Sequence, residues 1–382
     1  MISKQLPLYD LAEWKNGLAF RKIDFSNKGK PVIKIAELKN GITGQTQFTN
    51  GNYGEAVSLT RGDMVFSWSG NPETSIDVFW YDLPDGWLNQ HIFKVTPSEC
   101  VDKKYLYYLL KSLKPTFTAI ASNKQTTGLG HVTIKDLKEL IIDLPTRSTQ
   151  EAISNYLYAL DSKIHLNKQL NDNLQQQAAA LFANFYDQAE TEVGFTEMIQ
   201  ILGGGTPKTG ESSYWNGDIP FFTPKDVGFP YTLTTEKTIT EEGLAHCNSR
   251  LYPINTVFVT ARGTVGKVGL PGVPMAMNQS CYALVGKDTH QLLVYFYTLK
   301  AVDRLKHKAS GAVFDAITTR DFEAENIMKL SDDDTKAFLD VAEPIYQAVL
   351  NNSIENLRLS ELRDSLLPKL MNGEIDVTDI RL

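Results

Sequence analysis

The strongest constraint on this chain of 382 residues is an internal repeat, because short motifs of the first half return in the same order in the second half. Asn89-Gln90 matches Asn278-Gln279, which lies 189 residues further on. The aromatic run 105–111 matches 294–300 at the same separation of 189 residues. A shared order and spacing indicate two copies of one structural unit.

The repeat continues at a slightly shorter separation. Ile134-Lys135-Asp136-Leu137 matches 319–322, which lies 185 residues further on, and Leu166-Asn167 matches Leu350-Asn351 at a separation of 184. A deletion of about four residues in an intervening loop explains the change, since loops tolerate differences in length.

Each half is predicted to contain short strands followed by a helix. Turn-forming Gly, Asn and Pro clusters separate runs rich in β-formers. The runs are 31–38, 63–68, 77–81 and 91–95 in the first half, and 218–223, 255–260, 267–270 and 281–285 in the second. Helices are predicted near 103–113 and 290–307. Strands and helices in mixed order, without regular βαβ alternation, predict an α+β (mixed α/β) fold.

A long polar helix is predicted after the first half. Its seam repeats at intervals of four and three residues, a pattern typical of a helix that packs along another helix. The seam residues are Leu160, Ile164, Asn167, Asn171, Leu174, Ala178, Leu181 and Phe185. Buried Asn residues in such a seam specify the register and the partner. The alternative is that both Asn side chains face solvent and that Leu166 and Leu170 form the packed stripe.

A second long helix is predicted at 334–371, with a less regular seam. Its apolar positions are Val349, Ile354, Leu357, Leu362, Leu366 and Leu370. Pro344 is expected to break or kink the start of this helix.

These segments predict four parts: globular domains at 1–146 and 189–330, a central helical spacer at 147–188 and a C-terminal helical spacer at 331–382. If the helices run antiparallel, each globular domain lies at one end of the pair. Helices of this size extend on the order of 50–60 Å. That length exceeds one turn of DNA, which is about 34 Å.

The net charge of −7 argues against a nucleic-acid partner at first sight, since phosphate binding depends on Lys and Arg. The acidity is concentrated in 331–382, which contains five Lys and Arg residues and eleven Asp and Glu residues. The segments 1–146 and 189–330 are close to neutral, with balances of +2 and −2. The composition is therefore compatible with a basic face on either globular domain but does not demonstrate one.

The three cysteines, Cys100, Cys247 and Cys281, are widely spaced and are expected to be reduced, buried and free of disulfides or zinc. The sequence shows no signal peptide and no apolar run long enough to span a membrane, so a cytoplasmic location is expected.

Several segments of the second half closely resemble the target recognition domain of Type I restriction-modification specificity subunits. They are GGGTPKTGESSYWNGDIPFFTPKDV (203–227), NTVFVTARGTVGKVGL (255–270), MNQSCYAL (277–284) and ASGAVFDAITTRDFEAENI (309–327). The first half is similar over 62–70, 88–95 and 121–145, but it has GLAFRKIDFSNKGKP (17–31) where a GxTP segment is expected. The helical segments 150–186 and 335–375 resemble the spacer regions of this family.

The resemblance implies two target recognition domains joined by two antiparallel helices that form a coiled-coil spacer. Each domain would read one half of a bipartite, asymmetric target in the major groove of double-stranded DNA. The chain would be non-catalytic and would carry no cofactor. Two methyltransferase (modification) subunits would supply S-adenosylmethionine, and a motor-nuclease (restriction) subunit would use ATP and Mg.

Two alternatives stay open at this point. One is a helical scaffold or adaptor that does not bind DNA, and the other is the specificity subunit of a Type IIB-like or methylation-only complex.

Candidate DNA-binding residues are polar side chains in loops with Gly or Pro neighbours, because small neighbours allow the backbone to approach phosphate. In the first half they are Arg21, Lys22, Ser67, Ser69, Asn71, Lys124, Gln125 and Thr126. In the second half they are Thr206, Lys208, Lys225, Arg262, Thr264, Lys308 and Ser310. The repeated Asn-Gln pairs are interpreted as structural rather than base-reading, and the aromatic runs as core. No catalytic or metal-binding motif is identified.

Overall fold

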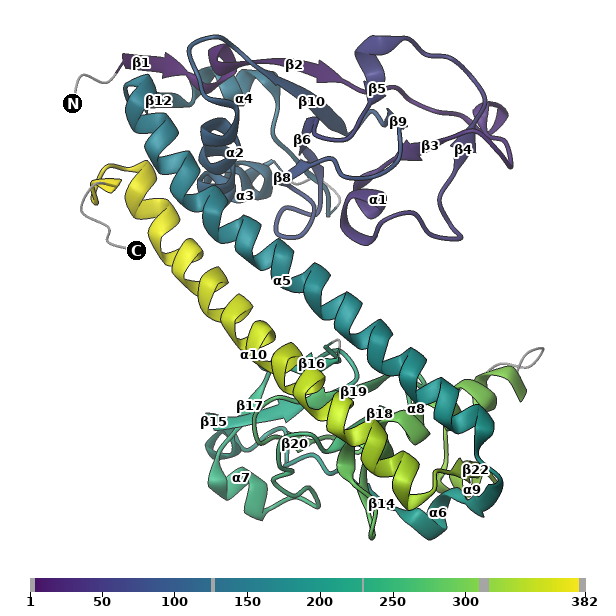
Figure 1. Cartoon of the computed structure of the whole chain (residues 1–382). Helices are drawn as coiled ribbons and strands as arrows, with labels where there is room; N and C mark the ends of the chain where they lie inside the picture. The colour runs from purple at the N-terminus through teal and green to yellow at the C-terminus, as the bar shows by residue number, and fades with distance from the viewer. Residues whose placement is uncertain (1–3, 125–127, 229, 309–315, 378–382) are drawn as a thin grey trace. The chain divides into compact units, whose positions relative to one another are not determined.

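The computed structural model describes residues 4–124, 128–228, 230–308 and 316–377 (Figure 1). The chain divides into two compact units, Met1–Ser162 with Leu359–Leu382 (unit 1) and Lys163–Arg358 (unit 2). Two long helices, α5 (Arg147–Gln188) and α10 (Asp332–Met371), each contribute residues to both units. Each unit combines sheets with helices, so the predicted α+β class is confirmed.

Unit 1 is built on two four-stranded sheets, ordered β2-β10-β6-β8 and β4-β3-β9-β5, and two small pairs, β1-β12 and β7-β11. Its strands are β1 (Lys4–Pro7), β2 (Ala12–Asn16), β3 (Lys30–Ile33), β4 (Phe48–Thr49), β5 (Ser58–Leu59), β6 (Met64–Ser67), β7 (Ser69–Gly70), β8 (Asp77–Trp80), β9 (Gly86–Leu88), β10 (Ile92–Pro97), β11 (Gly130–His131) and β12 (Ile141–Leu144). Its short helices are α1 (Ile35–Asn40), α2 (Lys103–Ser112), α3 (Lys114–Asn123) and α4 (Ile134–Glu139).

Unit 2 has a five-stranded sheet, β14-β21-β18-β19-β16, a three-stranded sheet, β17-β15-β20, and the pair β13-β22. Its strands are β13 (Thr191–Gly194), β14 (Ile199–Gly203), β15 (Trp215–Phe222), β16 (Tyr231–Thr232), β17 (Thr238–Ile239), β18 (Val257–Thr260), β19 (Val268–Pro271), β20 (Ala276–Met277), β21 (Cys281–Gly286) and β22 (Asn326–Lys329). Its helices are α6 (Phe195–Met198), α7 (Glu241–Ala245), α8 (Gln291–Lys308) and α9 (Thr319–Glu323).

The predicted repeat is confirmed by strand pairing. In unit 1, β3 pairs in parallel with β9, and Ile33 lies opposite Leu88. In unit 2, β15 pairs in parallel with β20, and Phe222 lies opposite Met277. Both residues of the second pair lie 189 positions after their counterparts in the first, the separation that the sequence motifs predict. The two units therefore share the strand register of one repeated domain.

The aromatic runs lie in the cores, as predicted. Tyr105 and Tyr108 of α2 are 1% and 2% exposed, and they pack with the strands of unit 1. In α8 of unit 2, Tyr295 and Tyr297 are similarly buried. Aromatic side chains on a helix thus anchor that helix to the sheet in each unit, because they bury large apolar surfaces.

The two long helices pack antiparallel within unit 2. Asn167 of α5 donates to Glu355 Oε2 at 2.6 Å, and Asn171, four residues later, donates to Val349 O at 3.3 Å, so the residue numbers run in opposite directions. Asn167 and Asn171 are 3% and 7% exposed. The predicted seam with buried Asn residues is confirmed. The alternative stripe is wrong, since Leu166 and Leu170 are 59% and 47% exposed.

The same two helices also pack antiparallel within unit 1, where other residues form the contacts. Arg363 Nη1 of α10 donates to Asp161 Oδ1 of α5 at 2.6 Å. Tyr108 of α2 donates its hydroxyl hydrogen to the other oxygen of the same carboxylate, also at 2.6 Å. This network connects both long helices to the core of the unit.

Four details differ from the predictions. Helix α10 continues through Pro344 without a break, and Leu362 is 42% exposed rather than in the seam. The run predicted as one strand at 31–38 divides into β3 and α1. Of the three cysteines, which are all free, Cys281 is buried but Cys100 is exposed.

Candidate nucleic-acid interface

A glycine at equivalent places in both units allows two backbone segments to meet. A Cβ atom on Gly17 would lie 2.2 Å from Asn89 O, and a Cβ atom on Gly204 would lie 2.1 Å from Asn278 O. Both distances are far below van der Waals contact, so only glycine fits. Gly17 is therefore the counterpart of Gly204 in the GGGTP segment, although the surrounding sequence differs.

The repeated Asn residues have the structural role that the sequence analysis favoured. Asn89 N donates to Ile33 O at 3.1 Å, and Asn278 N donates to Phe222 O at 3.0 Å. The side-chain oxygen of Asn278 accepts from Ser280 N at 3.1 Å, and that of Asn89 accepts from His91 N at 3.4 Å. These turns fix the start of the following strand in each unit.

Further along the chain, each unit has a short helix that is capped by a Thr–Asp pair. Thr133 and Asp136 cap α4, and Thr318 and Asp321 cap α9, with the threonine N and Oγ1 both donating to the aspartate Oδ2 at 2.7 Å in each case. Burial raises the pKa of Asp136, but hydrogen bonds from Lys124 and Thr133 outweigh burial and lower it. The carboxylate is therefore maintained in its ionised, capping form.

The chain just beyond a central strand, β6 in unit 1 and β18 in unit 2, is held by the same hydrogen bonds in both units. Beyond β6, Trp68 N donates to His91 O at 3.2 Å, and Trp68 O accepts from Val132 N at 2.9 Å. Beyond β18, Ala261 N donates to Ser280 O at 2.8 Å, and Ala261 O accepts from Ile317 N at 2.9 Å. The residues that come next along the chain, at 69 and 262, thus occupy equivalent positions.

The side chains at these equivalent positions differ. Ser69 is 4% exposed, and its hydroxyl is hydrogen-bonded to His131 Nδ1 at 3.0 Å. Arg262 is exposed and forms an isolated antiparallel bridge with Ala316 through its backbone. In each unit a glycine with positive φ follows, Gly70 (138°) or Gly263 (82°). The backbone is shared, whereas the chemistry presented on it is not.

Two predicted contact residues of the first half are corrected. Ser67 lies on β6 and is fully buried, and Ser69 lies on β7 and is turned toward His131. Neither side chain is available at the surface, because the chain leads from β6 directly into β7, which pairs with β11.

Among the other candidates, three lysines already have acidic partners in their own unit. These are Lys124 with Asp136, Lys225 with Glu236 at 3.7 Å, and Lys308 with Glu325. The side chains of Arg21, Lys22, Lys208 and Arg262 are exposed and form no salt bridge within the described parts of the chain, although Arg21 N donates to Asp24 Oδ2 at 2.6 Å.

The polar candidates that the structure describes form hydrogen bonds within their own unit. The Asn71 side-chain oxygen accepts from Thr74 N at 3.0 Å, Thr264 Oγ1 donates to Pro224 O at 3.1 Å, and Thr206 Oγ1 donates to Gln279 Oε1. Gln125, Thr126 and Ser310 lie outside the described residues.

A cluster of rings lies beside Ser69 and was not predicted from the sequence. Trp68 lies 5.9 Å from His91 and 6.0 Å from His131, measured between ring centroids, and it stacks on Phe93 at 5.5 Å. Partial burial lowers the pKa of His91 from its ordinary value of 6.5, and the neighbouring His131 lowers it further. No sequence spacing indicates this cluster, since it combines rings from segments near residues 68, 91–93 and 131 that are far apart in sequence.

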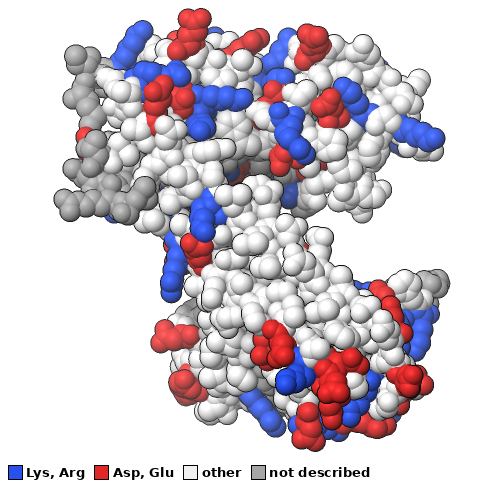
Figure 2. Space-filling model, viewed as in Figure 1, with Lys and Arg blue, Asp and Glu red and all other residues white. Residues whose placement is uncertain are grey.

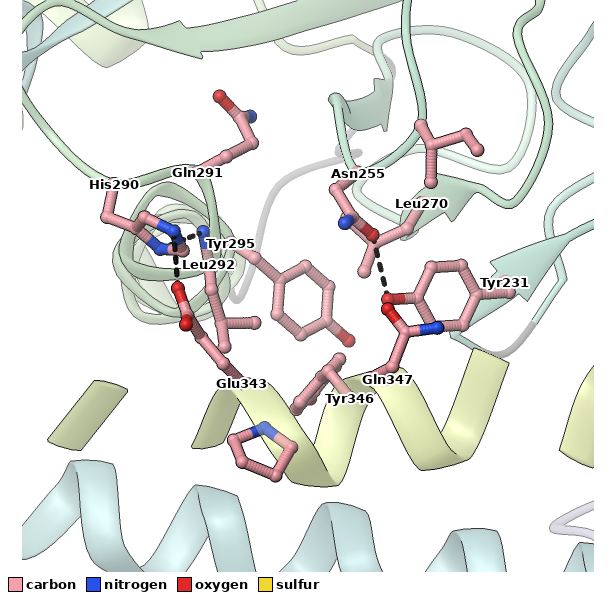
Figure 3. A pocket seen from close by; sticks show the side chains of 12 residues that line it. Tyr231, Asn255, Leu270, His290, Gln291, Leu292, Tyr295, Glu343, Tyr346 and Gln347 are labelled. Carbon is pink, nitrogen blue, oxygen red and sulfur yellow. Dashed lines mark hydrogen bonds and ion pairs between the residues drawn. The ribbon is translucent and has the colours of Figure 1, made fainter. Parts of the chain in front are cut away.

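A pocket of about 530 Å³ lies in unit 2 between α8, α10 and the strands β16 and β19 (Figure 3). Tyr231 donates to Asn255 Oδ1 at 2.8 Å on one wall, and His290 Nε2 lies 2.6 Å from Glu343 Oε1 on another. Tyr295 and Tyr346 point into the space from α8 and α10. Burial raises the pKa of Tyr295 to about 12, so its hydroxyl stays protonated. The pocket lies where α10 packs against the rest of unit 2.

Charge is unevenly distributed along the long helices. Helix α10 begins with Asp332, Asp333 and Asp334 in its first turn. By contrast, the stretch 173–186 of α5 contains no Asp, Glu, Lys or Arg. Acidic and basic side chains mingle over much of the face seen in Figure 2.

Within residues 4–124, 128–228, 230–308 and 316–377, no helix has the length and the apolar character that spanning a membrane requires. No group of three or more His, Cys, Asp or Glu side chains there is arranged to hold a metal ion.

Comparison with known proteins identifies the repeated unit. The sequence matches the Type I restriction modification DNA specificity domain over residues 3–176 and 191–329. The HindI specificity subunit of Haemophilus influenzae is 25% identical over 403 residues, covering 83% of this chain and 87% of that protein. The EcoR124I/EcoR124II specificity subunit of Escherichia coli is 29% identical over 207 residues, covering 51% of this chain and 50% of that protein.

The fold is also similar to a solved structure. The S subunit of a Type-I restriction-modification system from M. genitalium aligns with a TM-score of 0.58 and 17% sequence identity, covering 97% of this chain and 96% of that one. The family match falls on both copies of the structural repeat. The chain therefore belongs to the Type I restriction modification DNA specificity family, as a recognition subunit rather than a catalytic one.

Proposed function

We propose that the two halves of this specificity subunit read the two halves of one bipartite target in double-stranded DNA. The reading domains correspond to 1–146 and 189–330, and the helical segments 147–188 and 331–382 set the distance between them. The family match favours this function over a DNA-independent adaptor or a Type IIB-like subunit.

The observation that carries the proposal is a shared backbone with different side chains. The strand-end hydrogen bonds of Trp68 recur at Ala261, and the caps of α4 and α9 are identical. The residues presented next, Ser69 and Arg262, differ in size, charge and exposure. A duplicated scaffold with different surface chemistry is suited to reading two different short sequences, because base edges are distinguished by side-chain donors and acceptors.

The remaining candidates form two groups of proposed contacts. The cations are suited to phosphate or guanine, and the loop amides and hydroxyls to other base edges and the backbone. In the first half they are Arg21, Lys22, Asn71, Lys124, Gln125 and Thr126. In the second half they are Thr206, Lys208, Lys225, Arg262, Thr264, Lys308 and Ser310.

The long helices supply proposed surfaces for other subunits of the complex. The exposed residues of the uncharged stretch 173–186 are Asn173, Gln176, Gln177, Ala179, Ala180 and Asn184. Depletion of charge is typical of the centre of a protein interface. Phosphate repels the acidic turn at Asp332–Asp334, so that end of α10 also suits a protein partner. We propose two modification subunits that bring S-adenosylmethionine, and a restriction subunit that uses ATP and Mg, in the cytoplasm.

Linking two reading domains raises affinity, because engagement of the second half of the target becomes intramolecular. Each domain then needs only weak affinity of its own, and the helical spacer selects targets with the correct separation between halves.

The test is to sequence the methylome of the host with and without the gene. Loss of one bipartite methylated motif on deletion, and its return on complementation, is the expected result. If every methylated motif persists in the deletion strain, the proposed function is wrong. Binding of the assembled complex to a target duplex should also weaken steeply as salt rises, since Lys and Arg displace counterions from phosphate.

A further inference from the structure

The position shared by Ser69 and Arg262 is held by backbone contacts in both units. Arg262 N donates to Ser280 O at 3.3 Å, and the bridge to Ala316 connects its backbone to the segment that leads into α9. In unit 1, Ser69 pairs with His131 on β11, which leads into α4. Backbone contacts on both sides thus fix where each side chain begins, which favours a precise contact over an adaptable one.

The Arg262 side chain is exposed and has no acidic partner among the described residues. Several other cations of unit 2 are already engaged. Lys225 pairs with Glu236, Lys308 and Arg304 both pair with Glu325, and Lys237 lies over the Trp215 ring. Within the described residues, Arg262 therefore carries a guanidinium without an ion-pair partner just beyond the end of β18, between Ala261, which is 3% exposed, and the positive-φ Gly263.

We propose that Arg262 is a specificity-determining residue that reads a guanine in the half-target bound by unit 2. The guanidinium donates two parallel hydrogen bonds, which match the O6 and N7 acceptors of guanine in the major groove. Unit 1 has no cation at the equivalent position, because Ser69 is buried against His131. This position therefore discriminates between the two half-targets. The inference rests on the proposed function, since it assigns one residue within the same recognition event.

The test replaces the gene in its host with one encoding Arg262→Ala and sequences the methylome. One guanine position in one half of the motif should become degenerate, while the other half stays as stringent as in the wild type. A bidentate arginine–guanine contact is worth about 1–3 kcal/mol, so discrimination at that base pair should fall by about 5- to 150-fold. Methylation of sites that carry the full wild-type motif should fall by a smaller factor than the discrimination at that base pair.

Lys208→Ala provides the matched control, because Lys208 is an exposed cation of the same unit without an acidic partner in the described chain. A phosphate contact carries no sequence information, so this variant should lower methylation evenly and leave the motif unchanged. Arg262→Gln is a second variant. It removes the charge and should also weaken the preference for guanine at that position, because an amide matches adenine N6 and N7 instead.

Three results would overturn the inference. They are an unchanged motif in both Arg262 variants, an even loss of methylation like that of Lys208→Ala, or a motif with no guanine in the half that changes. In each case the wild-type gene still directs a bipartite motif, so the proposed function stands while the assignment of Arg262 fails. Absence of any wild-type motif instead contradicts the proposed function itself.

Discussion

Asn171 of α5 donates a hydrogen bond to the backbone carbonyl oxygen of Val349 in α10, at 3.3 Å, within unit 2. The same side chain accepts from Asn352 Nδ2 at 2.8 Å and contacts Ser353 Oγ at 3.4 Å. A buried amide with partners on the facing helix fixes the register of the pair, because any shift leaves those groups unpaired.

Asn171→Ala should destabilise the protein by about 1–3 kcal/mol, since it leaves the Asn352 amide without its acceptor and removes packing from the seam. Leu166→Ala is the control on the same helix, because Leu166 is 59% exposed. It should change stability by no more than about 0.5 kcal/mol. Urea unfolding of both variants measures the difference. Equal effects would mean that the buried amide does not hold the helix pair.

Gly204→Ala should destabilise unit 2 by about 1–3 kcal/mol or more, because the new methyl group would lie 2.1 Å from Asn278 O and must displace backbone. Gly203→Ala is a close control, since a Cβ atom there meets no atom within 4 Å. That control should be neutral or stabilising by up to about 1 kcal/mol, because alanine restricts the unfolded chain. Thermal unfolding compares the two, and similar melting temperatures would refute the steric account.

Thr318→Ala should cost about 1 kcal/mol, because it removes the N-cap hydroxyl that donates to Asp321 Oδ2 at 2.7 Å. Thr133→Ala should have a similar cost in unit 1, where the Thr133 hydroxyl donates to Asp136 Oδ2 at 2.7 Å in the same way. Thr319→Ala tests the specificity of the effect, since Thr319 is exposed and lies inside α9. Denaturation midpoints that shift equally for Thr318→Ala and Thr319→Ala would contradict the capping role.

The pKa of His91 should lie below 6.5, because partial burial and the nearby His131 both disfavour its charged form. The unfolded chain therefore binds this proton more readily than the folded chain, and stability falls as pH drops below about 6.5. Nuclear magnetic resonance titration of the imidazole signals measures the pKa directly. His131→Gln should raise the pKa of His91 toward 6.5. A pKa at or above 6.5 in the wild type would show that the ring cluster does not form as described.

The repeat, the helices and the seam could be predicted from the sequence because each is marked by a regular spacing of residues along the chain. Asn89 and Asn278 share a separation with the aromatic runs, and the buried Asn167 and Asn171 follow the intervals of the seam. Such patterns survive in a single sequence because every copy of the scaffold needs the same turns and the same packed face.

The contact residues were harder to predict, because their exposure depends on pairing between distant segments. Ser67 and Ser69 were expected in a polar loop, but the chain there continues as β7 and pairs with β11, about sixty residues later. The segment 17–31 was placed opposite the GxTP segment, but the shared role of Gly17 and Gly204 could not be predicted, since the requirement is only a missing side chain. Helix α10 continues through Pro344 because helix propensity is outweighed by packing along the helix, including the buried Tyr346.

The central claim is that two units read two halves of one DNA target at a fixed separation. The most direct measurement is the affinity of the assembled complex for duplexes that carry the methylated motif intact, with one half scrambled, or with five base pairs inserted between the halves. The account predicts a large loss of affinity for either scrambled half and for the insertion. Affinity that is unchanged by the insertion, or that depends on one half alone, would contradict it.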